Sequence, residues 1–338
     1  MALEIIWFFL WGLLWAIYFI TDGFDLGVGS MIPFLAKNDS EKRIMYNSLG
    51  PLWDGNEVWL ITAGGVTFAA FPLVYSVMFS TLYTPLMLIL FALILRGVSF
   101  EFRHQINNPS WQLLWDCLMC AGSFIPAFLF GVAFANIFQG IPFDENGVFY
   151  GNICSLLNPY GILGGMTFAL LFLFHGCIWL AIKTENDLKD RAIYLSQVLW
   201  FMLLVVCVVF IAASKYATNL FDNFYHNPIL YLIVIITVIS LISARIFISN
   251  LEYWKAWFAS ALTIAGCVFF GIIGLFPNLF PSSINSAFNL TAYNSSSSPL
   301  TLKIMLIVVL LFLPIVLAYQ IWSYILFKDK VEVEELIY

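Results

Sequence analysis

Four carboxylates with a regular spacing are the residues of this sequence best suited to chemistry. Asp22 and Asp25 lie in the stretch TDGFDLGVG, and Asp54 and Glu57 lie in GPLWDGNEVWLI. The members of each pair are three residues apart, so on a helix their side chains share one face. Ionisable groups inside a membrane are costly and usually face a partner or a wet cavity. The spacing therefore indicates a site that binds or passes on protons or cations.

Other side chains accompany the acids. Trp53, Asn56 and Trp59 lie beside the second pair in the sequence. We expect the two tryptophans to line a path for protons past the acids and to fix this helix at the membrane interface. Arg96, which ends a separate apolar segment, could hold one acid ionised. Asp54 lies at the centre of the most distinctive motif and is the main candidate for a proton carrier.

A simpler structural explanation competes with this one. Asp54 falls in a first helical turn, where the helix dipole stabilises a negative charge. All four acids could also lie shallow enough to contact water. Position along the chain does not decide between the two explanations.

Composition identifies the elements that must position these residues. Of the 338 residues, 62% are hydrophobic and only 10% are charged, with a mean hydropathy of +0.93. A soluble core cannot absorb that much apolar surface, so the chain is an all-α polytopic membrane protein. Pro85 and Pro126 fall within spans and should kink them. A span needs about 20 apolar residues, and nine segments qualify, at residues 5–27, 52–72, 75–95, 112–137, 160–182, 192–213, 228–248, 254–275 and 303–326.

The distribution of basic residues predicts the orientation. With nine spans, 12 of the 14 Lys and Arg residues fall on one side of the membrane and 2 on the other. Basic loops stay in the cytoplasm, which places the N-terminus outside and the C-terminus inside. We expect one membrane domain over residues 1–338, made of a four-helix bundle at 1–140, a second at 158–276 and a ninth helix at 301–328.

Cysteine and histidine usage argues against a metal or haem site in this chain. Cys117 and Cys120 form a C-x-x-C pair inside a span with no second pair, which is typical of buried packing residues. His175 is the one histidine within a span, so two axial histidines for a haem are lacking. Met166 could complete a ligand pair, but no spacing pattern marks it. Basic patches are absent, which argues against nucleic-acid binding.

Several long stretches resemble subunit II of the cytochrome bd-type quinol oxidases, including its cyanide-insensitive relatives. The resemblance covers nearly the whole chain in order, except for a shortened connection, KYATNLFDNFYHNP, between the sixth and seventh spans. The stretches that carry it are TDGFDLGVG, NDSEKRIMYNSLGPLWDGNEVWLITAGG, FALILRGVSFEFR, GSFIPAFLFGVAFANIFQGIPF, LLNPYGILGG and FPNLFPSSINSAFNLTAYNSSSSPLTLKIM.

The resemblance implies a function. Members of this family work as heterodimers in the bacterial cytoplasmic membrane, sometimes with a small accessory subunit. Subunit I carries two b-type haems and one d-type haem, or b-type haem alone in some relatives. It oxidises quinol at an outward-facing site and reduces O2 to water with protons from the cytoplasm. Subunit II has no haem ligands, and a structural quinone or lipid is a further candidate ligand.

Within that function, we expect Asp22, Asp25, Asp54 and Glu57 to line a hydrophilic path from the cytoplasm toward subunit I. The loop between the first two spans lets them pack as antiparallel neighbours and brings the two pairs together. A proton-coupled secondary transporter, with the acids as its coupling-ion site, is the alternative, and a purely structural membrane partner is a third. Transporters bind cargo near the midplane at broken helices, whereas these acids gather toward one side.

Overall fold

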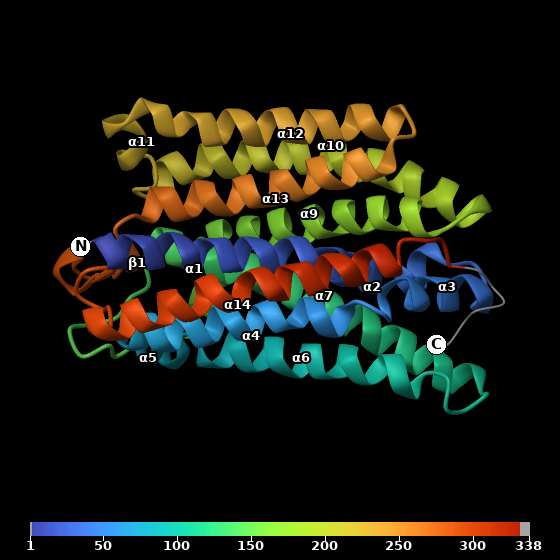
Figure 1. Cartoon of the computed structure of the whole chain (residues 1–338), viewed down its shortest axis with the longest axis horizontal. Coiled ribbons are helices and arrows are strands. Elements are labelled where there is room, and N and C mark those ends of the chain that lie inside the picture. Colours follow the sequence, from blue (N-terminus) through green and yellow to red (C-terminus); the bar gives the residue numbers. More distant parts are fainter. Residues whose placement is uncertain (1, 332–338) are drawn as a thin grey trace.

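Helices running along one long axis make up nearly the whole molecule (Figure 1). The computed structural model describes residues 2–331. The first half contains α1 (Ala2–Thr21), α2 (Gly23–Leu35), α3 (Asp39–Leu49), α4 (Trp53–Ala70), α5 (Pro72–Thr81), α6 (Tyr83–Phe102) and α7 (Pro109–Gln139). The second half contains α8 (Ile153–Leu156), α9 (Pro159–Lys183), α10 (Asn186–Ala217), α11 (Asp222–His226), α12 (Tyr231–Ser249), α13 (Tyr253–Leu275) and α14 (Pro299–Leu326).

Short elements lie between the long helices. The 3-10 turns are η1 (Pro228–Leu230) and η2 (Ser286–Phe288), and the two strands β1 (Asn278–Phe280) and β2 (Leu290–Thr291) pair antiparallel. The strands lie at the end of the molecule where α1 begins (Figure 1). The Ser282 hydroxyl donates to the Phe143 carbonyl at 2.6 Å, which ties this segment to the loop after α7.

Eight stretches in the described part of the chain are long and apolar enough to cross a membrane. They are Ala2–Leu35, Tyr83–Phe102, Pro109–Gln139, Pro159–Lys183, Asn186–Ala217, Pro228–Ser249, Tyr253–Leu275 and Pro299–Leu326. The remaining expected span, residues 52–72, corresponds to α4, whose first two turns hold Asp54, Asn56 and Glu57. Figure 1 shows α4 lying parallel to the long axis, between α14 and α6. The count of nine spans and the orientation of the termini stay predictions.

The first expected span is longer than predicted and is interrupted. The chain continues from α1 into α2 and ends at Leu35, where the hydropathy pattern predicted an end near residue 27. The interruption falls at Asp22, between the two helices. Most of α2 is buried because it lies against α7 and α9, so its apolar residues pack inside the protein.

The third expected span, residues 75–95, is also displaced. The chain first forms the short helix α5 and begins α6 only at Tyr83. Phe71 has non-helical dihedral angles, and Pro72 then occupies the first position of α5, where its missing N–H is not needed. Pro85 falls in the first turn of α6, three residues after the break at Leu82 that separates α5 from α6.

The arrangement of the helices centres on α9. It packs against α2 and α7 on one side and against α10 and α13 on the other, while α12 lies on α13. Division into bundles at residues 1–140 and 158–276 stays a prediction, because α9 contacts both groups. The last helix, α14, lies along α1 and α4 (Figure 1), and Leu302 is its one buried residue within the described chain.

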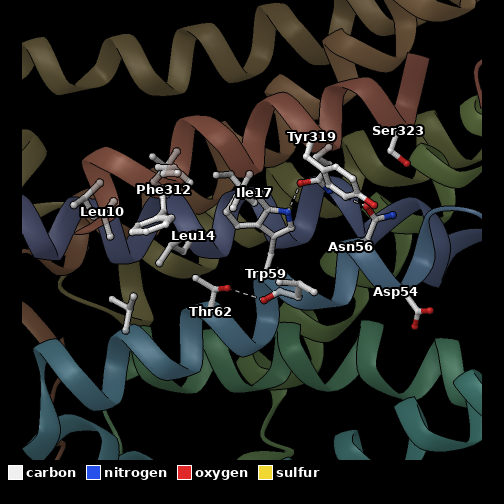
Figure 2. Close-up of a pocket in the computed structure, with 18 of the residues that line it drawn as sticks. Leu10, Leu14, Ile17, Asp54, Asn56, Trp59, Thr62, Phe312, Tyr319 and Ser323 are labelled. Carbon is white, nitrogen blue, oxygen red and sulfur yellow. Dashed lines mark hydrogen bonds between the residues drawn. The ribbon is translucent and has the colours of Figure 1, made fainter. Parts of the chain in front are cut away.

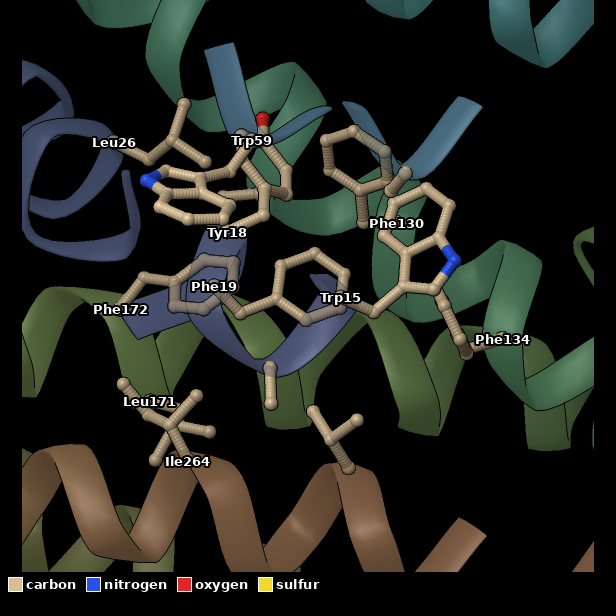
Figure 3. Packing of buried hydrophobic residues seen from close by; sticks show 14 of the residues in the cluster. Trp15, Tyr18, Phe19, Leu26, Trp59, Phe130, Phe134, Leu171, Phe172 and Ile264 are labelled. Carbon is tan, nitrogen blue, oxygen red and sulfur yellow. The ribbon is translucent and has the colours of Figure 1, made fainter. Parts of the chain in front are cut away.

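Aromatic side chains fill the space between α1, α7 and α9 (Figure 3). Phe19 lies at the centre of this packing, with ring centroids 5.5 Å from Phe134 and 5.1 Å from Phe168, both edge to face. Trp15 contacts Phe134 in the same way, at 5.2 Å. Edge-to-face contacts of this kind stabilise aromatic pairs beyond the area they bury. The packing holds α1 rigidly just before the interruption at Asp22.

Candidate functional site

A buried arginine joins two of the predicted acids. Arg96 of α6 donates from Nη2 to Asp22 Oδ1 at 2.7 Å and to Glu57 Oε1 at 2.5 Å. The side chains of Arg96 and Asp22 are 1% and 0% exposed, while that of Glu57 is 25% exposed. The bridge connects α4, α6 and the junction of α1 with α2. Asp22 itself keeps helical dihedral angles, and its backbone bonds to Tyr18 and Leu26 carry the helical path through the α1–α2 junction.

The fourth residue of the cluster, Asp25, is held by an amide. Asn56 Nδ2 of α4 donates to Asp25 Oδ2 at 2.7 Å, and both side chains are buried. Asn56 Oδ1 in turn accepts from the Tyr324 hydroxyl at 2.9 Å and from Gln320 Nε2 at 3.2 Å. Trp59 Nε1 donates to Gln320 Oε1 at 2.6 Å (Figure 2). A continuous chain of hydrogen bonds therefore connects α2, α4 and α14.

Asp54 does not join this cluster. Its side chain is exposed, and Figure 2 shows it directed away from Asn56 and Trp59. Asp54 and Asn56 are two positions apart on α4, so their side chains point about 160° away from each other around the helix. Glu57, three residues after Asp54, points between the directions of the Asp54 and Asn56 side chains, and it accepts a hydrogen bond from Arg96. Trp53 also lies outside the cluster, stacked on Phe100 with ring centroids 5.0 Å apart.

Sequence reasoning missed the residues that α14 contributes. Gln320 and Tyr324 are spaced i, i+4 on a helix that is otherwise strongly apolar, which was the available signal. It was overlooked because neither residue is ionised at neutral pH. Tyr18 was missed as well; its buried hydroxyl lies one turn before Asp22.

Several polar atoms of the cluster have no hydrogen-bond partner among the described residues. The acceptors are Asp22 Oδ2 and Asp25 Oδ1, and the donors are Tyr18 OH, Arg96 Nε and Arg96 Nη1. Buried polar atoms left without a partner are expensive, and ordered water commonly satisfies them. Three carboxylates and one guanidinium leave the cluster with excess negative charge when all are ionised, and a proton bound within the cluster would reduce that excess. This arrangement can accept, hold and release a proton.

A separate polar cluster lies next to α3. Arg103 Nε donates to Asp116 Oδ1 at 2.6 Å, and Arg103 Nη2 donates to Asp39 Oδ1 at 2.6 Å. Lys42 Nζ reaches Asp116 Oδ2 at 2.9 Å. Burial lowers the pKa of Arg103, but Asp116 and Asp39 outweigh it and raise the pKa above its usual value. These bonds dock α3 against α6 and α7, so we assign Asp116 to α3 docking rather than to the Arg96 cluster.

His175 does not fit the role of a haem ligand. Its Nδ1 lies 2.6 Å from Ser260 Oγ and its Nε2 lies 3.2 Å from the Ile20 carbonyl oxygen, so both ring nitrogens are engaged. The ring is fully buried and stacks on Trp257 with centroids 5.2 Å apart. Within residues 2–331, no group of three His, Cys, Asp or Glu side chains could hold a metal ion.

A cavity of about 510 Å³ extends from the cluster between α1, α4 and α14. Leu10, Leu14 and Phe312 line its apolar length, and Asn56 lies at its polar end (Figure 2). Gln320, the hydrogen-bond partner of Asn56, also lines the cavity. The shape suits an elongated apolar molecule with a polar group at one end.

Known proteins share this sequence and this fold. The family described as cytochrome bd terminal oxidase subunit II matches residues 3–327. The cytochrome bd ubiquinol oxidase subunit 2 of Bacillus subtilis is 37% identical, covering 99% of this chain and 98% of that protein. The probable cytochrome oxidase subunit 2 of Haemophilus influenzae is 39% identical (95% and 93% covered), and the cytochrome bd-I ubiquinol oxidase subunit 2 of Escherichia coli K12 is 36% identical (96% and 93% covered).

A solved structure supports the fold independently. A chain of the bd oxidase from Geobacillus thermodenitrificans superposes with a TM-score of 0.78, covering 96% of this chain and 99% of that one at 16% identity. These matches extend over nearly all of this chain and favour the oxidase subunit over the transporter alternative. The chain is a multi-pass protein of the bacterial cytoplasmic membrane and belongs to the cytochrome bd terminal oxidase subunit II family.

Proposed function

We propose that this chain is the haem-free subunit of a two-subunit terminal oxidase that oxidises quinol and reduces O2 to water. Relatives that are 37% and 36% identical over nearly their full length are named as subunit 2 of ubiquinol oxidases, which supports the reaction and implies a subunit I. Subunit I would hold two b-type haems and one d-type or further b-type haem. A small accessory membrane subunit is a further candidate partner.

The residues of this chain fit a supporting role in that reaction. The buried imidazole of His175 is engaged at both nitrogens, so we place the haems in subunit I. The cavity between α1, α4 and α14 has the size and lining for a structural quinone or a lipid tail, with Asn56 and Gln320 at its polar end. Assembly with subunit I is the other role that we assign to this chain.

The cluster around Arg96 would deliver cytoplasmic protons to subunit I. Oxygen reduction consumes protons, and a hydrocarbon interior conducts none, so carboxylates, hydroxyls and water must carry them. Exposure falls stepwise along the acids: Asp54 is exposed, Glu57 is 25% exposed, and Asp22 and Asp25 are buried. The proposal rests on this decrease in solvent exposure from Asp54 to Asp22 and Asp25, whose carboxylates each keep one oxygen atom without a hydrogen-bond partner among the described residues.

The acids have different tasks along the path. Arg96 contacts Asp22 and Glu57 directly and holds both side chains in place. Asp25 has an amide as its direct partner instead of a cation, so it is the acid of the cluster best placed to take up and release a proton. Asp54, at the exposed end, would collect protons from the cytoplasm, where water can substitute for it.

Two substitutions in the assembled oxidase test this path. Asp25→Asn keeps the shape of the side chain and removes the exchangeable proton, so quinol oxidase turnover should fall on the order of a hundredfold, as for loss of a proton-transfer group. Asp54→Asn should slow turnover by only about threefold, because water replaces the mouth group. Asp187→Asn, at the exposed start of α10, serves as the matched control.

Assembly and haem content should be unchanged in all three variants, as visible spectra and subunit stoichiometry would show. Charge separation across the membrane should fall together with turnover in Asp25→Asn. If Asp25→Asn assembles normally and turns over at the wild-type rate from mildly acidic to alkaline pH, the path does not run through Asp25.

A further inference from the structure

We propose that Gln320 and Tyr324 of α14 are positioning residues that orient the Asn56 amide and thereby control which form of Asp25 is stabilised. The inference rests on the proposed role of Asp25 in proton delivery. It adds a helix that the acid motifs did not include, and it assigns a function to polar side chains in an otherwise apolar span. The direction of each hydrogen bond from Trp59 to Asp25 decides which atoms of Gln320 and Asn56 face each other.

The direction of the chain is set at Trp59. An indole N–H can donate but cannot accept, so the atom of Gln320 that faces Trp59 Nε1 at 2.6 Å must be its carbonyl oxygen. The amide nitrogen of Gln320 is then turned the other way, where it donates to Asn56 Oδ1 at 3.2 Å. A side-chain amide has one oxygen and one nitrogen, so the orientation of one determines the other.

Tyr324 reinforces the same orientation. Its hydroxyl donates to Asn56 Oδ1 at 2.9 Å, so this oxygen accepts two hydrogen bonds from α14. The Tyr324 ring is held by packing, with centroids 6.3 Å from Phe24 and 6.1 Å from Trp179. With its oxygen committed to α14, Asn56 must present its nitrogen to Asp25, and Nδ2 donates to Asp25 Oδ2 at 2.7 Å.

The orientation matters for the chemistry of Asp25. A hydrogen bond donated to a carboxylate favours its ionised form. If Asn56 were free to flip, its oxygen could instead accept a hydrogen bond from protonated Asp25, and the neutral form would be favoured. Asp25 Oδ1, which has no partner among the described residues, is left as the atom that binds the transferred proton. The chain of amides therefore keeps Asp25 ready to release that proton.

The position of α14 depends on contacts at its ends as well as on this chain. Near its start, Trp7 Nε1 donates to the Leu302 carbonyl at 3.0 Å. Beyond its end, Lys183 Nζ of α9 donates to the carbonyls of Phe327 and Asp329. These anchors hold α14 at the distance from α4 at which Gln320 and Tyr324 reach Asn56. A shift of α14 would release the amide and change the behaviour of Asp25.

The test uses the complete oxidase with substitutions that interrupt the series of hydrogen bonds from Trp59 to Asp25 but leave the acids intact. Gln320→Leu combined with Tyr324→Phe removes both donors to Asn56 Oδ1, and Trp59→Phe, the milder variant, removes only the group that sets the direction. The controls are Tyr194→Phe and Trp322→Phe, which make matched changes at residues of α10 and α14 that are 71% and 57% exposed.

Difference infrared spectroscopy across a pH series would follow the protonated carboxyl band that disappears in Asp25→Asn. In the Gln320→Leu/Tyr324→Phe variant, the midpoint of this band should move to higher pH by about one unit, a tenfold change in proton binding. Trp59→Phe should move it in the same direction by less, and both controls should match wild type. Turnover should fall in the chain variants, and these substitutions should have no further effect in an Asp25→Asn background.

The outcomes separate the two proposals. Suppose that Asp25→Asn slows turnover and removes the band, but that the band midpoint is unchanged in Gln320→Leu/Tyr324→Phe and in Trp59→Phe. The positioning role of α14 is then wrong, and the proton path stands. A turnover loss that persists unchanged in the Asp25→Asn background would also overturn it, because the effect would not act through Asp25. If Asp25→Asn removes no band and does not slow turnover, both proposals fail.

Discussion

Arg96 and Asp22 form an ion pair in which both side chains are almost completely withdrawn from solvent, with Nη2 and Oδ1 2.7 Å apart. The two residues come from α6 and from the α1–α2 junction, separated by 74 positions in the chain. Bringing two charges out of water is favourable only when each compensates the other. Loss of either partner would therefore leave the other as a buried charge without compensation.

Removing Arg96 should destabilise the protein more than removing the pair. Arg96→Met leaves Asp22 buried without its cation and should cost about 3–5 kcal/mol of stability. Arg96→Met combined with Asp22→Asn should regain much of this loss. Thermal unfolding of the purified complex measures both. Lys255→Met, which breaks an exposed pair with Glu252, is the control and should change little. Equal loss in the single and double variants would contradict the prediction.

The close approach of α2 to α9 depends on glycine. A β-carbon at Gly27 would lie 2.0 Å from the Phe172 carbonyl oxygen, which is backbone and cannot move aside. Gly27→Ala should therefore separate the two helices, shift Asp25, and lower both the yield of folded complex and its turnover. At Gly64 a β-carbon would meet nothing within 4 Å in this chain, so Gly64→Ala should be tolerated. A wild-type yield and rate for Gly27→Ala would show that the contact is unimportant.

The docking of α3 should weaken in acid. Burial raises the pKa of Glu41, but hydrogen bonds from Arg191 and the Lys37 N–H outweigh it and hold the pKa below the ordinary value of 4.5. The contribution of Glu41 is then complete above that value and is lost as pH falls through the folded-state pKa. Glu41→Gln should lower the unfolding temperature at neutral pH, by the equivalent of about 1 kcal/mol or less.

The same variant should remove part of the decline in stability at low pH. Unfolding temperatures of wild type and Glu41→Gln, measured from pH 7 downward, should converge below the folded-state pKa. A constant difference between the two at all pH values would mean that the ion pair with Arg191 is not responsible.

Topology can be checked by labelling single cysteines, with the exposed Cys117 and Cys154 replaced by serine. Cysteine at Ser40 or Glu185 should react only from the cytoplasm, and cysteine at Asn146 only from outside. The motive is the segregation of basic residues, and all three positions are exposed. Labelling of Asn146 from the cytoplasm would reverse the orientation and remove the cytoplasmic origin of the proposed path.

The sequence by itself determined the class of protein and the residues worth attention. An apolar content of 62% and long apolar segments leave a polytopic helical membrane protein as the only reasonable interpretation, which the structure and the family match confirm. The acid motifs also led to the correct family. Helix boundaries follow less directly from the sequence: hydropathy does not distinguish a buried helix such as α2 from a lipid-facing one, so the apolar pattern ends the first span too early.

Only the tertiary structure decided which polar residues meet. Periodicity gives the direction of a side chain from its own helix, but it does not show which neighbouring helix that side chain faces. The spacing of Asp54 and Glu57 predicted a shared role, yet the fold turns Glu57 to Arg96 and leaves Asp54 exposed. Asn56 takes the inward place and finds Gln320 of α14, 264 residues away. A buried polar group must be satisfied by whatever the fold brings beside it, and partners that distant leave no pattern in the local sequence.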